Sequence, residues 1–145
     1  MQILKKHKID SKTCRETIER IAAFLKGEKA VSFAYIYGSF IEDSGFNDID
    51  LAVFVDEAIV NHEKMLDYQL DLSVNLEREF MSYPVDVRAL NIAPLSFRFS
   101  VITKGELTFS RDERERVSFE VMTRSLYFDF KPHAEFFYQK IALGA

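Results

Sequence analysis

The stretch YIYGSF (residues 35–40), followed by NDIDLAVFV (residues 47–55), decides the fold of this chain. Val31 to Tyr37 and Ile49 to Val55 are rich in β-branched and aromatic residues, which is typical of buried strands. A Gly-Ser pair ends the first run, and a short polar segment separates it from the second. We therefore expect the two strands to pair as an antiparallel hairpin.

Helical patterns lie on both sides of this hairpin. They predict an N-terminal helix that begins at Asp10 or Ser11 and stops near Gly27, and a long helix from about Asn61 to Phe80. The expected core-facing residues of the long helix are Leu66, Leu70, Val74 and Glu77.

The C-terminal half continues the alternation of strands and helices. The predicted elements are a strand from Val85 to Leu90, a short helix from Pro94 to Lys104, an edge strand from Glu106 to Ser110, a helix from Asp112 to Phe128, a break at Asp129-Phe130-Lys131-Pro132 and a last short helix to about Ile141. The long helix joins strands two and three, as a right-handed parallel crossover requires. The expected fold class is α/β (α+β), a small mixed sheet flanked by helices. We expect one domain over residues 1–145, with an N-terminal helix (1–28), a core (30–110) and C-terminal helices (111–145).

Composition narrows the classes of function. Of 145 residues, 48 % are hydrophobic and only eight are glycine or proline (5 + 3), which indicates a globular domain. A net charge of −4 argues against strong binding to nucleic acid or to anionic membranes. A single cysteine, Cys14, and the absence of a signal peptide in MQILKKHKID favour the cytoplasm. With three scattered histidines, the chain also lacks the usual ligands of a structural zinc site.

Three carboxylates are the strongest chemical signal. Asp48 and Asp50 are two positions apart, so on a strand their side chains point to the same face. Asp86 lies near the start of the third strand. If strands two and three are parallel neighbours, both begin at the same edge of the sheet, next to Gly38-Ser39.

Three carboxylates in one place repel each other, because two like charges 4 Å apart cost about 4 kcal/mol at an effective dielectric constant near 20. A divalent cation removes that cost, and oxygen ligands favour Mg²⁺ or Mn²⁺. Gly38 lets the backbone approach a phosphate, and Ser39 offers N–H and hydroxyl donors. An isolated Asp-x-Asp pair is more often a solvated strand end, so the prediction depends on the combination.

The chain resembles a known family at these residues. YIYGSF…NDIDLAVFV, followed by PVDVRAL, resembles the nucleotidyltransferase superfamily to which DNA polymerase beta belongs. The tail VDVRALNIAPLSFRFSVITKGELTFSRDERERV…YFDFKP resembles that of the minimal nucleotidyltransferase (MNT) proteins encoded beside HEPN-domain partners. The resemblance covers roughly residues 30 to 135.

The resemblance implies an activity and roles for five residues. Asp48, Asp50 and Asp86 would be the catalytic carboxylates that bind two Mg²⁺ ions, with Asp86 helping to activate the acceptor hydroxyl. Gly38 and Ser39 would hold the phosphates of ATP. The implied function is that of an antitoxin, an enzyme that transfers AMP from ATP to a tyrosine of a HEPN ribonuclease toxin (AMPylation).

The segment FIEDSGFN (residues 40–47) departs from the family pattern. It is shorter than usual, and it lacks the arginine that many members carry just after Gly-Ser. Arg88 is a candidate substitute, because it lies two residues from Asp86 on the same face of strand three. The alternative is that Arg88 only pairs with Asp86 or with solvent.

Aromatic residues gather near the C-terminus. They are Phe119, Tyr127, Phe128, Phe130, Phe136, Phe137 and Tyr138. We expect Phe119 and Tyr127 to pack in the core, and others to form a surface for a partner or a homo-oligomer.

Two further functions stay open. One is a non-catalytic antitoxin that occludes its HEPN partner; the other is nucleotidyl transfer to a small molecule of the aminoglycoside type.

Overall fold

The structure is a computed structural model that describes residues 10–41, 48–80 and 83–144. Its elements are α1 (Ser11–Lys26), β1 (Val31–Tyr37), η1 (Gly38–Phe40), β2 (Ile49–Val55), η2 (His62–Lys64), α2 (Met65–Phe80), β3 (Val85–Ala89), η3 (Leu90–Ile92), α3 (Leu95–Lys104), β4 (Glu106–Ser110) and α4 (Glu113–Gly144). Within these ranges, none of the helices combines the length and the apolar character needed to cross a membrane.

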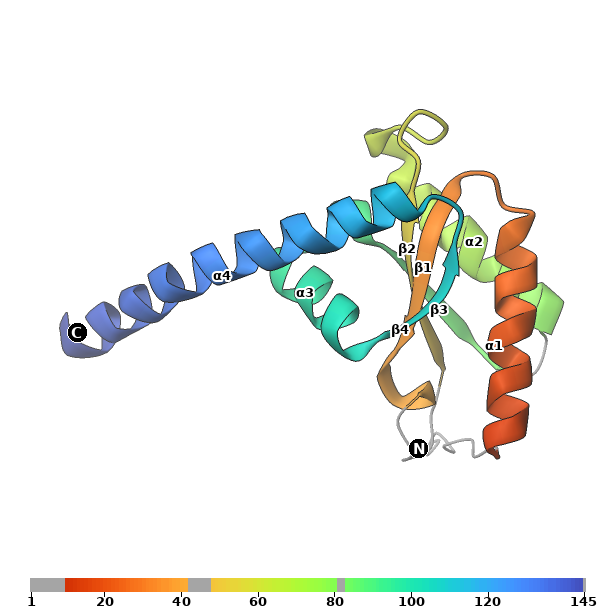
Figure 1. The fold of residues 1–145 in the computed structure, drawn as a ribbon, viewed down its shortest axis with the longest axis horizontal. Helices are drawn as coiled ribbons and strands as arrows, with labels where there is room; N and C mark the ends of the chain where they lie inside the picture. Colours follow the sequence, from red (N-terminus) through yellow and green to blue (C-terminus); the bar gives the residue numbers. More distant parts are fainter. Residues whose placement is uncertain (1–9, 42–47, 81–82, 145) are drawn as a thin grey trace, which may run out of the picture.

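The four strands form one mixed sheet in the order β3-β2-β1-β4 (Figure 1). β1 pairs with β2 and with β4 in antiparallel fashion, and β2 pairs with β3 in parallel. The predicted hairpin, the parallel crossover through the long helix and the edge position of β4 are all confirmed. Tyr37 lies opposite Asp50, and Asp50 lies opposite Asp86, so these three residues form a row across the sheet.

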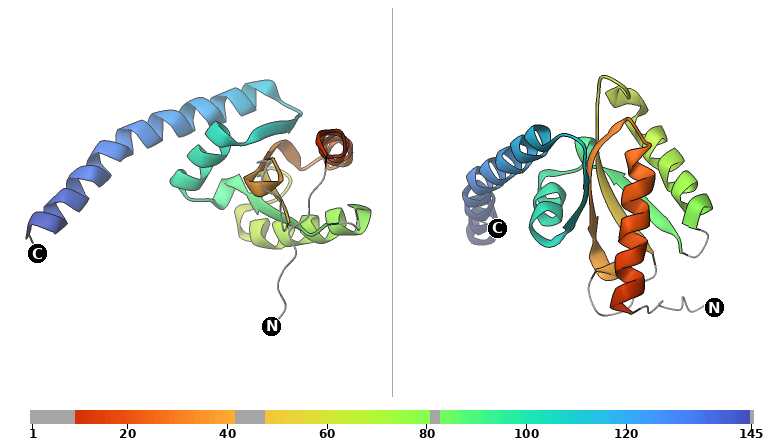
Figure 2. Two further views of the ribbon diagram at one scale, coloured as in Figure 1. Left: turned by 90° about the horizontal axis from the view of Figure 1, so that it is seen from below. Right: turned by 45° about the vertical axis from the view of Figure 1, so that its right-hand side comes forward.

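Helices cover both faces of the sheet. α1 and α2 lie on one face, and α3 and the first turns of α4 lie on the other (Figures 1 and 2). Between the sheet and α1 and α2, Ile21, Leu25 and Leu72 are buried in the larger core cluster. Phe33 and Val101 belong to the second cluster, on the face of α3. β1 is therefore buried on both faces, which explains its unbroken run of apolar residues.

The bounds predicted for the N-terminal helix, α1, are confirmed. Asp10 is the N-cap, and its carboxylate accepts a hydrogen bond of 2.7 Å from the Thr13 backbone N–H. Gly27 is the C-cap.

The packing face of α2 differs from the prediction. Leu66, Leu70 and Val74 are 59 %, 60 % and 46 % exposed, and Glu77 is exposed as well. The buried residues of the helix are Met65, Leu72 and Leu76. Both sets have helical spacing, so periodicity alone did not distinguish them.

A row of polar side chains on α2 caps the outer edge of β3. The backbone N–H of Val85 donates to Glu77 Oε1 at 3.1 Å, that of Val87 to Ser73 Oγ at 2.9 Å, and that of Ala89 to Gln69 Oε1 at 3.0 Å. These bonds replace the neighbouring strand that an edge strand lacks. They fix β3, and with it Asp86, from the side opposite β2.

The C-terminal helix is also longer than predicted. The expected break at residues 129–132 is wrong, because α4 continues from Glu113 to Gly144 with Pro132 inside it. Pro132 has no N–H to donate to the Phe128 carbonyl four residues earlier. The helix surface is exposed there, so water can satisfy that carbonyl. Phe119 packs against Phe33 and Phe54 as expected, at 5.4 and 5.2 Å between ring centroids.

Candidate active site

Asp48, Asp50 and Asp86 come together at one edge of the sheet, as the topology predicted. Each offers a carboxylate oxygen that lies within 4.8 Å of the other two, and all three are partly exposed. Asp50 and Asp86 are brought together by the parallel register of β2 and β3, and Asp48 immediately precedes β2. The buried Ile49 and Val85 anchor the starts of these strands in the core, so the acidic side chains lie on the opposite face, which α3 covers.

Gly38 forms the wall of this acidic cluster on the side of β1. It has a φ of +80°, and a Cβ built there would lie 2.5 Å from Asp50 Oδ2. Any other residue would be strained and would displace the Asp50 carboxylate. Ser39 follows in η1, and the buried Phe40 fixes this turn in the core. Residues 42–47 of the segment that departs from the family pattern lie outside the described residues.

Asp50 is the carboxylate most affected by its surroundings. Burial, and then the charges of Asp48 and Asp86, raise its pKa from 3.8 to about 6, although Arg88 opposes this rise. The cluster therefore concentrates negative charge that its own side chains do not neutralise. Such a group of carboxylates is suited to a divalent cation.

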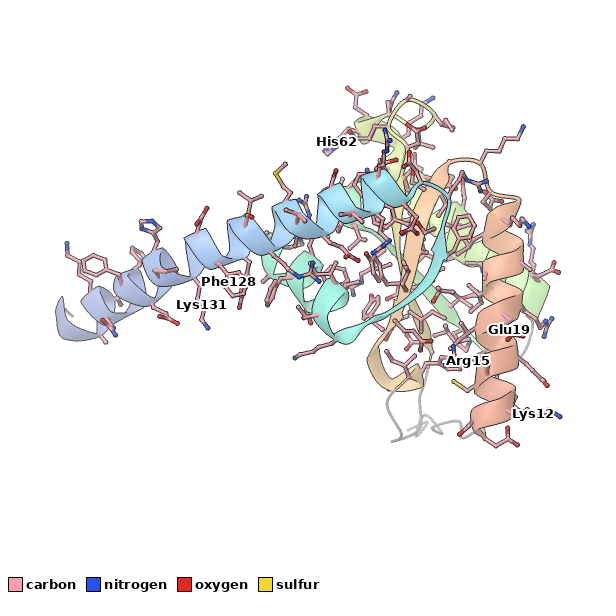
Figure 3. The ribbon with its side chains drawn as sticks, viewed as in Figure 1. Lys12, Arg15, Glu19, His62, Phe128 and Lys131 are labelled. Carbon is pink, nitrogen blue, oxygen red and sulfur yellow. The ribbon has the colours of Figure 1, made fainter. Side chains whose placement is uncertain are left out.

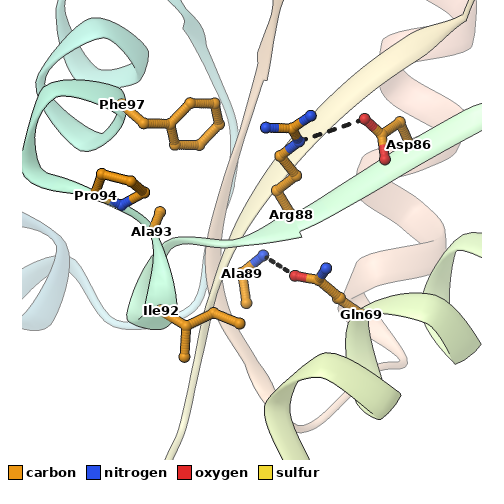
Figure 4. A pocket seen from close by; sticks show the side chains of 8 residues that line it. All are labelled: Gln69, Asp86, Arg88, Ala89, Ile92, Ala93, Pro94 and Phe97. Atoms are coloured by element: carbon orange, nitrogen blue, oxygen red, sulfur yellow. Dashed lines mark hydrogen bonds and ion pairs between the residues drawn. The ribbon is translucent and has the colours of Figure 1, made fainter.

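Arg88 lies next to the acidic cluster and pairs with one of its members. Its Nε is 3.5 Å from Asp86 Oδ2, and the two side chains are 57 % and 45 % exposed. The guanidinium carbon is 5.5 Å from the centroid of the Phe97 ring. Figure 4 shows Arg88 between Asp86 and Phe97 in a pocket of about 420 Å³. Arg88 thus does make the ion pair with Asp86, while part of it remains open to solvent.

A family model described as polymerase beta, nucleotidyltransferase, matches residues 19–114, roughly two thirds of the chain. The chain belongs to this nucleotidyltransferase family. The match contains all four strands and every residue of the acidic cluster, and it ends at the start of α4. None of the functionally curated proteins matches the chain.

Solved structures with the same fold include complexes of toxins with antitoxins. A chain of a Shewanella oneidensis complex, a tri-AMPylated HEPN toxin with an MNT antitoxin, is 19 % identical and has a TM-score of 0.67, covering 89 % of this chain and 98 % of that one. An MntA–HepT toxin–antitoxin structure is 19 % identical, with a TM-score of 0.66 and coverages of 88 % and 98 %. A toxin–antitoxin structure with AMP-PNP is 18 % identical, with a TM-score of 0.63 and coverages of 92 % and 99 %.

Two aromatic residues beside the acidic cluster were not predicted from the sequence. Burial and then the charge of Asp50 raise the pKa of Tyr37 well above its usual value, which places the phenol beside the carboxylates. The Tyr37 ring packs edge-on against Phe97, with 5.3 Å between centroids. The position of Tyr37 opposite Asp50 follows from the hairpin register, whereas nothing in the sequence indicates that Phe97 of α3 reaches the same place.

Proposed function

We propose that this nucleotidyltransferase is a magnesium-dependent protein adenylyltransferase that acts as an antitoxin. It transfers AMP from ATP to a tyrosine of a HEPN-domain ribonuclease toxin. The observation that carries the proposal is the cluster of Asp48, Asp50 and Asp86, with their oxygens within 4.8 Å, beside the positive-φ turn at Gly38.

The residues present fit Mg²⁺. The candidate ligands in the described part of the cluster are carboxylate oxygens alone, which is the ligand type that Mg²⁺ prefers. Burial, and then the charges of Asp48 and Asp86, raise the pKa of Asp50, and a cation would relieve the repulsion between these carboxylates. Asp48, Asp50 and Asp86 would hold two ions. When bound, Mg²⁺ supplies polarisation of the α-phosphate and neutralises charge on the leaving group.

The protein groups have complementary roles in the transfer. Gly38 leaves room for the triphosphate, and Ser39 donates hydrogen bonds to it. The tyrosine oxygen of the acceptor forms a bond to the α-phosphorus of ATP, and the bond from that phosphorus to the bridging oxygen breaks. The phenolic proton passes to Asp86, and pyrophosphate leaves. In this proposal Arg88, two residues from Asp86, binds phosphate oxygens.

The choice of acceptor is supported by the solved structures rather than by the site. One solved structure with this fold is a complex of an MNT antitoxin with a tri-AMPylated HEPN toxin, and one toxin–antitoxin structure contains AMP-PNP. These structures are 18–19 % identical to this chain, and a direct assay of transfer tests the acceptor.

The test is incubation of the chain with labelled ATP, Mg²⁺ and the protein encoded by the adjacent gene, which the proposal predicts to be a HEPN protein. We expect label on a tyrosine of the HEPN protein, located by peptide mass spectrometry, and loss of its ribonuclease activity. Asp48→Ala and Asp50→Ala should abolish labelling. Asp67→Ala, which removes an exposed carboxylate from α2, is the matched control and should label as the wild type does.

The same experiment separates transfer from occlusion. If Asp50→Asn neutralises the HEPN protein as well as the wild type does, and no label appears, the protein acts as a non-catalytic binding module. If label appears on a small molecule but never on the HEPN protein, the proposed acceptor is wrong.

A further inference from the structure

The far half of α4 carries an apolar surface that its own chain leaves exposed. α4 extends past the rest of the molecule in every view (Figures 1 and 2), and Figure 3 labels Phe128 and Lys131 on this extension. Phe130, Phe137 and Ile141 are 58 %, 61 % and 51 % exposed. We call these three residues the distal stripe.

The distal stripe continues the face by which α4 packs on its own domain. Phe119, which contacts Phe33, and the buried Thr123 lie on that face near the start of the helix. Phe130 follows Thr123 by seven residues, and Phe137 follows Phe130 by seven more, which keeps all of them on one side. An intramolecular packing face thus runs on without interruption into an exposed one.

The length of the extension indicates that something covers the stripe. Beyond Pro132 the helix has only about three turns, and helix propensity alone stabilises a segment of that length only marginally. Pro132 also removes one of the hydrogen bonds that would tie this end to the rest of α4. Packing of the apolar face is the usual source of the missing stability.

Charges beside the stripe favour a second copy of this chain in antiparallel orientation. Asp129 and Lys140 lie on the same flank of the stripe, one near each end of it. In a two-fold antiparallel pair of helices, each flank meets the same flank of the partner with the ends reversed. Asp129 of each copy then lies near Lys140 of the other, while Phe130 lies near Ile141.

We propose that the distal stripe is a homodimer interface, in which the α4 helices of two copies pack antiparallel. Two Asp129–Lys140 pairs flank a contact made by Phe130, Phe137 and Ile141. The family match ends at Arg114, before this segment, so the interface lies outside the nucleotidyltransferase core. The proposal does not depend on the proposed function, because it concerns the chain without nucleotide or partner.

The test is sedimentation equilibrium of the chain alone over a range of micromolar concentrations. We expect a mass that approaches twice the chain's 16.9 kDa as the concentration rises. Phe130→Asp should shift the protein to monomer at every concentration. Val121→Asp is the matched control, because Val121 is 57 % exposed on the opposite side of the helix and should leave the dimer intact.

Exchanging the two charges distinguishes loss of the interface from unfolding of the helix end. Asp129→Lys alone and Lys140→Asp alone should each weaken the dimer at least tenfold, and the double variant should restore it. A wild type that stays monomeric throughout, or a double variant no better than the single ones, overturns the proposal. The proposal is also overturned if the wild-type chain is monomeric and Phe130→Asp loses its complex with the HEPN protein. In that case the stripe binds only the HEPN protein.

Discussion

Replacing Asp50 by asparagine should stabilise the metal-free protein while abolishing its activity. The ionised Asp50 carboxylate is partly buried and lies beside two others, which raises its pKa from 3.8 to about 6. From that difference in pKa, the ionised Asp50 carboxylate lowers the free energy of unfolding by at most about 3 kcal/mol at pH 7. Because Asp50 keeps some contact with solvent, we expect about 1–2 kcal/mol, or a rise in Tm of about 3–6 °C.

The pH dependence gives this prediction a sign that can be checked. The pKa of Asp50 is higher in the folded state than in the unfolded state, so protonation favours folding. The favourable contribution is complete below about pH 4 and is lost as the pH rises through about 6. The advantage of Asp50→Asn over the wild type should therefore be largest at pH 7 and should shrink towards pH 4.

The assay is urea denaturation in EDTA and in saturating Mg²⁺, with Asp67→Asn as the control for loss of an exposed carboxylate. Mg²⁺ should stabilise the wild type and the control, and should have little effect on Asp50→Asn. An Asp50→Asn protein that is less stable than the wild type in EDTA would refute the electrostatic reasoning. An equal response of both proteins to Mg²⁺ would refute the assignment of Asp50 as a ligand.

Three other substitutions test separate parts of the site. Gly38→Ala places a Cβ 2.5 Å from Asp50 Oδ2. The initial rate of AMP transfer should fall at least tenfold, while the circular dichroism spectrum stays that of the wild type. An unchanged rate would contradict this account of the turn. Arg88→Ala should raise the KM for ATP several-fold with kcat little changed, whereas a change in kcat alone would mean that Arg88 acts only through its ion pair with Asp86. Ser73→Ala leaves the Val87 N–H without its acceptor and should lower the free energy of unfolding by about 1 kcal/mol. Hydrogen exchange of the Val87 amide should accelerate. Protection of that amide equal to the wild type would argue against the role of α2 in holding β3.

Local chemistry was sufficient to predict the strands and the acidic cluster. β1 and β2 were predicted at their observed bounds, because β-branched and aromatic runs end at a glycine turn and at an aspartate. The meeting of Asp50 with Asp86 followed from topology, since a helix of the right length joins two parallel strands. Both inferences depend on short-range patterns and on general rules of connection.

The wrong predictions concern helices α2 and α4, whose environment is set by residues that are distant in the sequence or by solvent. Leu66, Leu70 and Val74 form as regular a stripe as the residues that α2 buries. The packing face is set by the edge of β3, which needs acceptors from Ser73 and its polar neighbours, and this requirement is visible only in three dimensions. In α4, the helix tolerates Pro132 at an exposed position, so the local signal for a break was misleading.

Isothermal titration calorimetry with AMP-PNP and Mg²⁺ tests the central claim most directly. The acidic cluster beside Gly38 should bind the nucleotide only when Mg²⁺ is present, and Asp50→Asn should remove that binding while the fold persists. Nucleotide binding that is equally strong in EDTA, or that survives in Asp50→Asn, would contradict the claim that these carboxylates hold a metal-bound nucleotide.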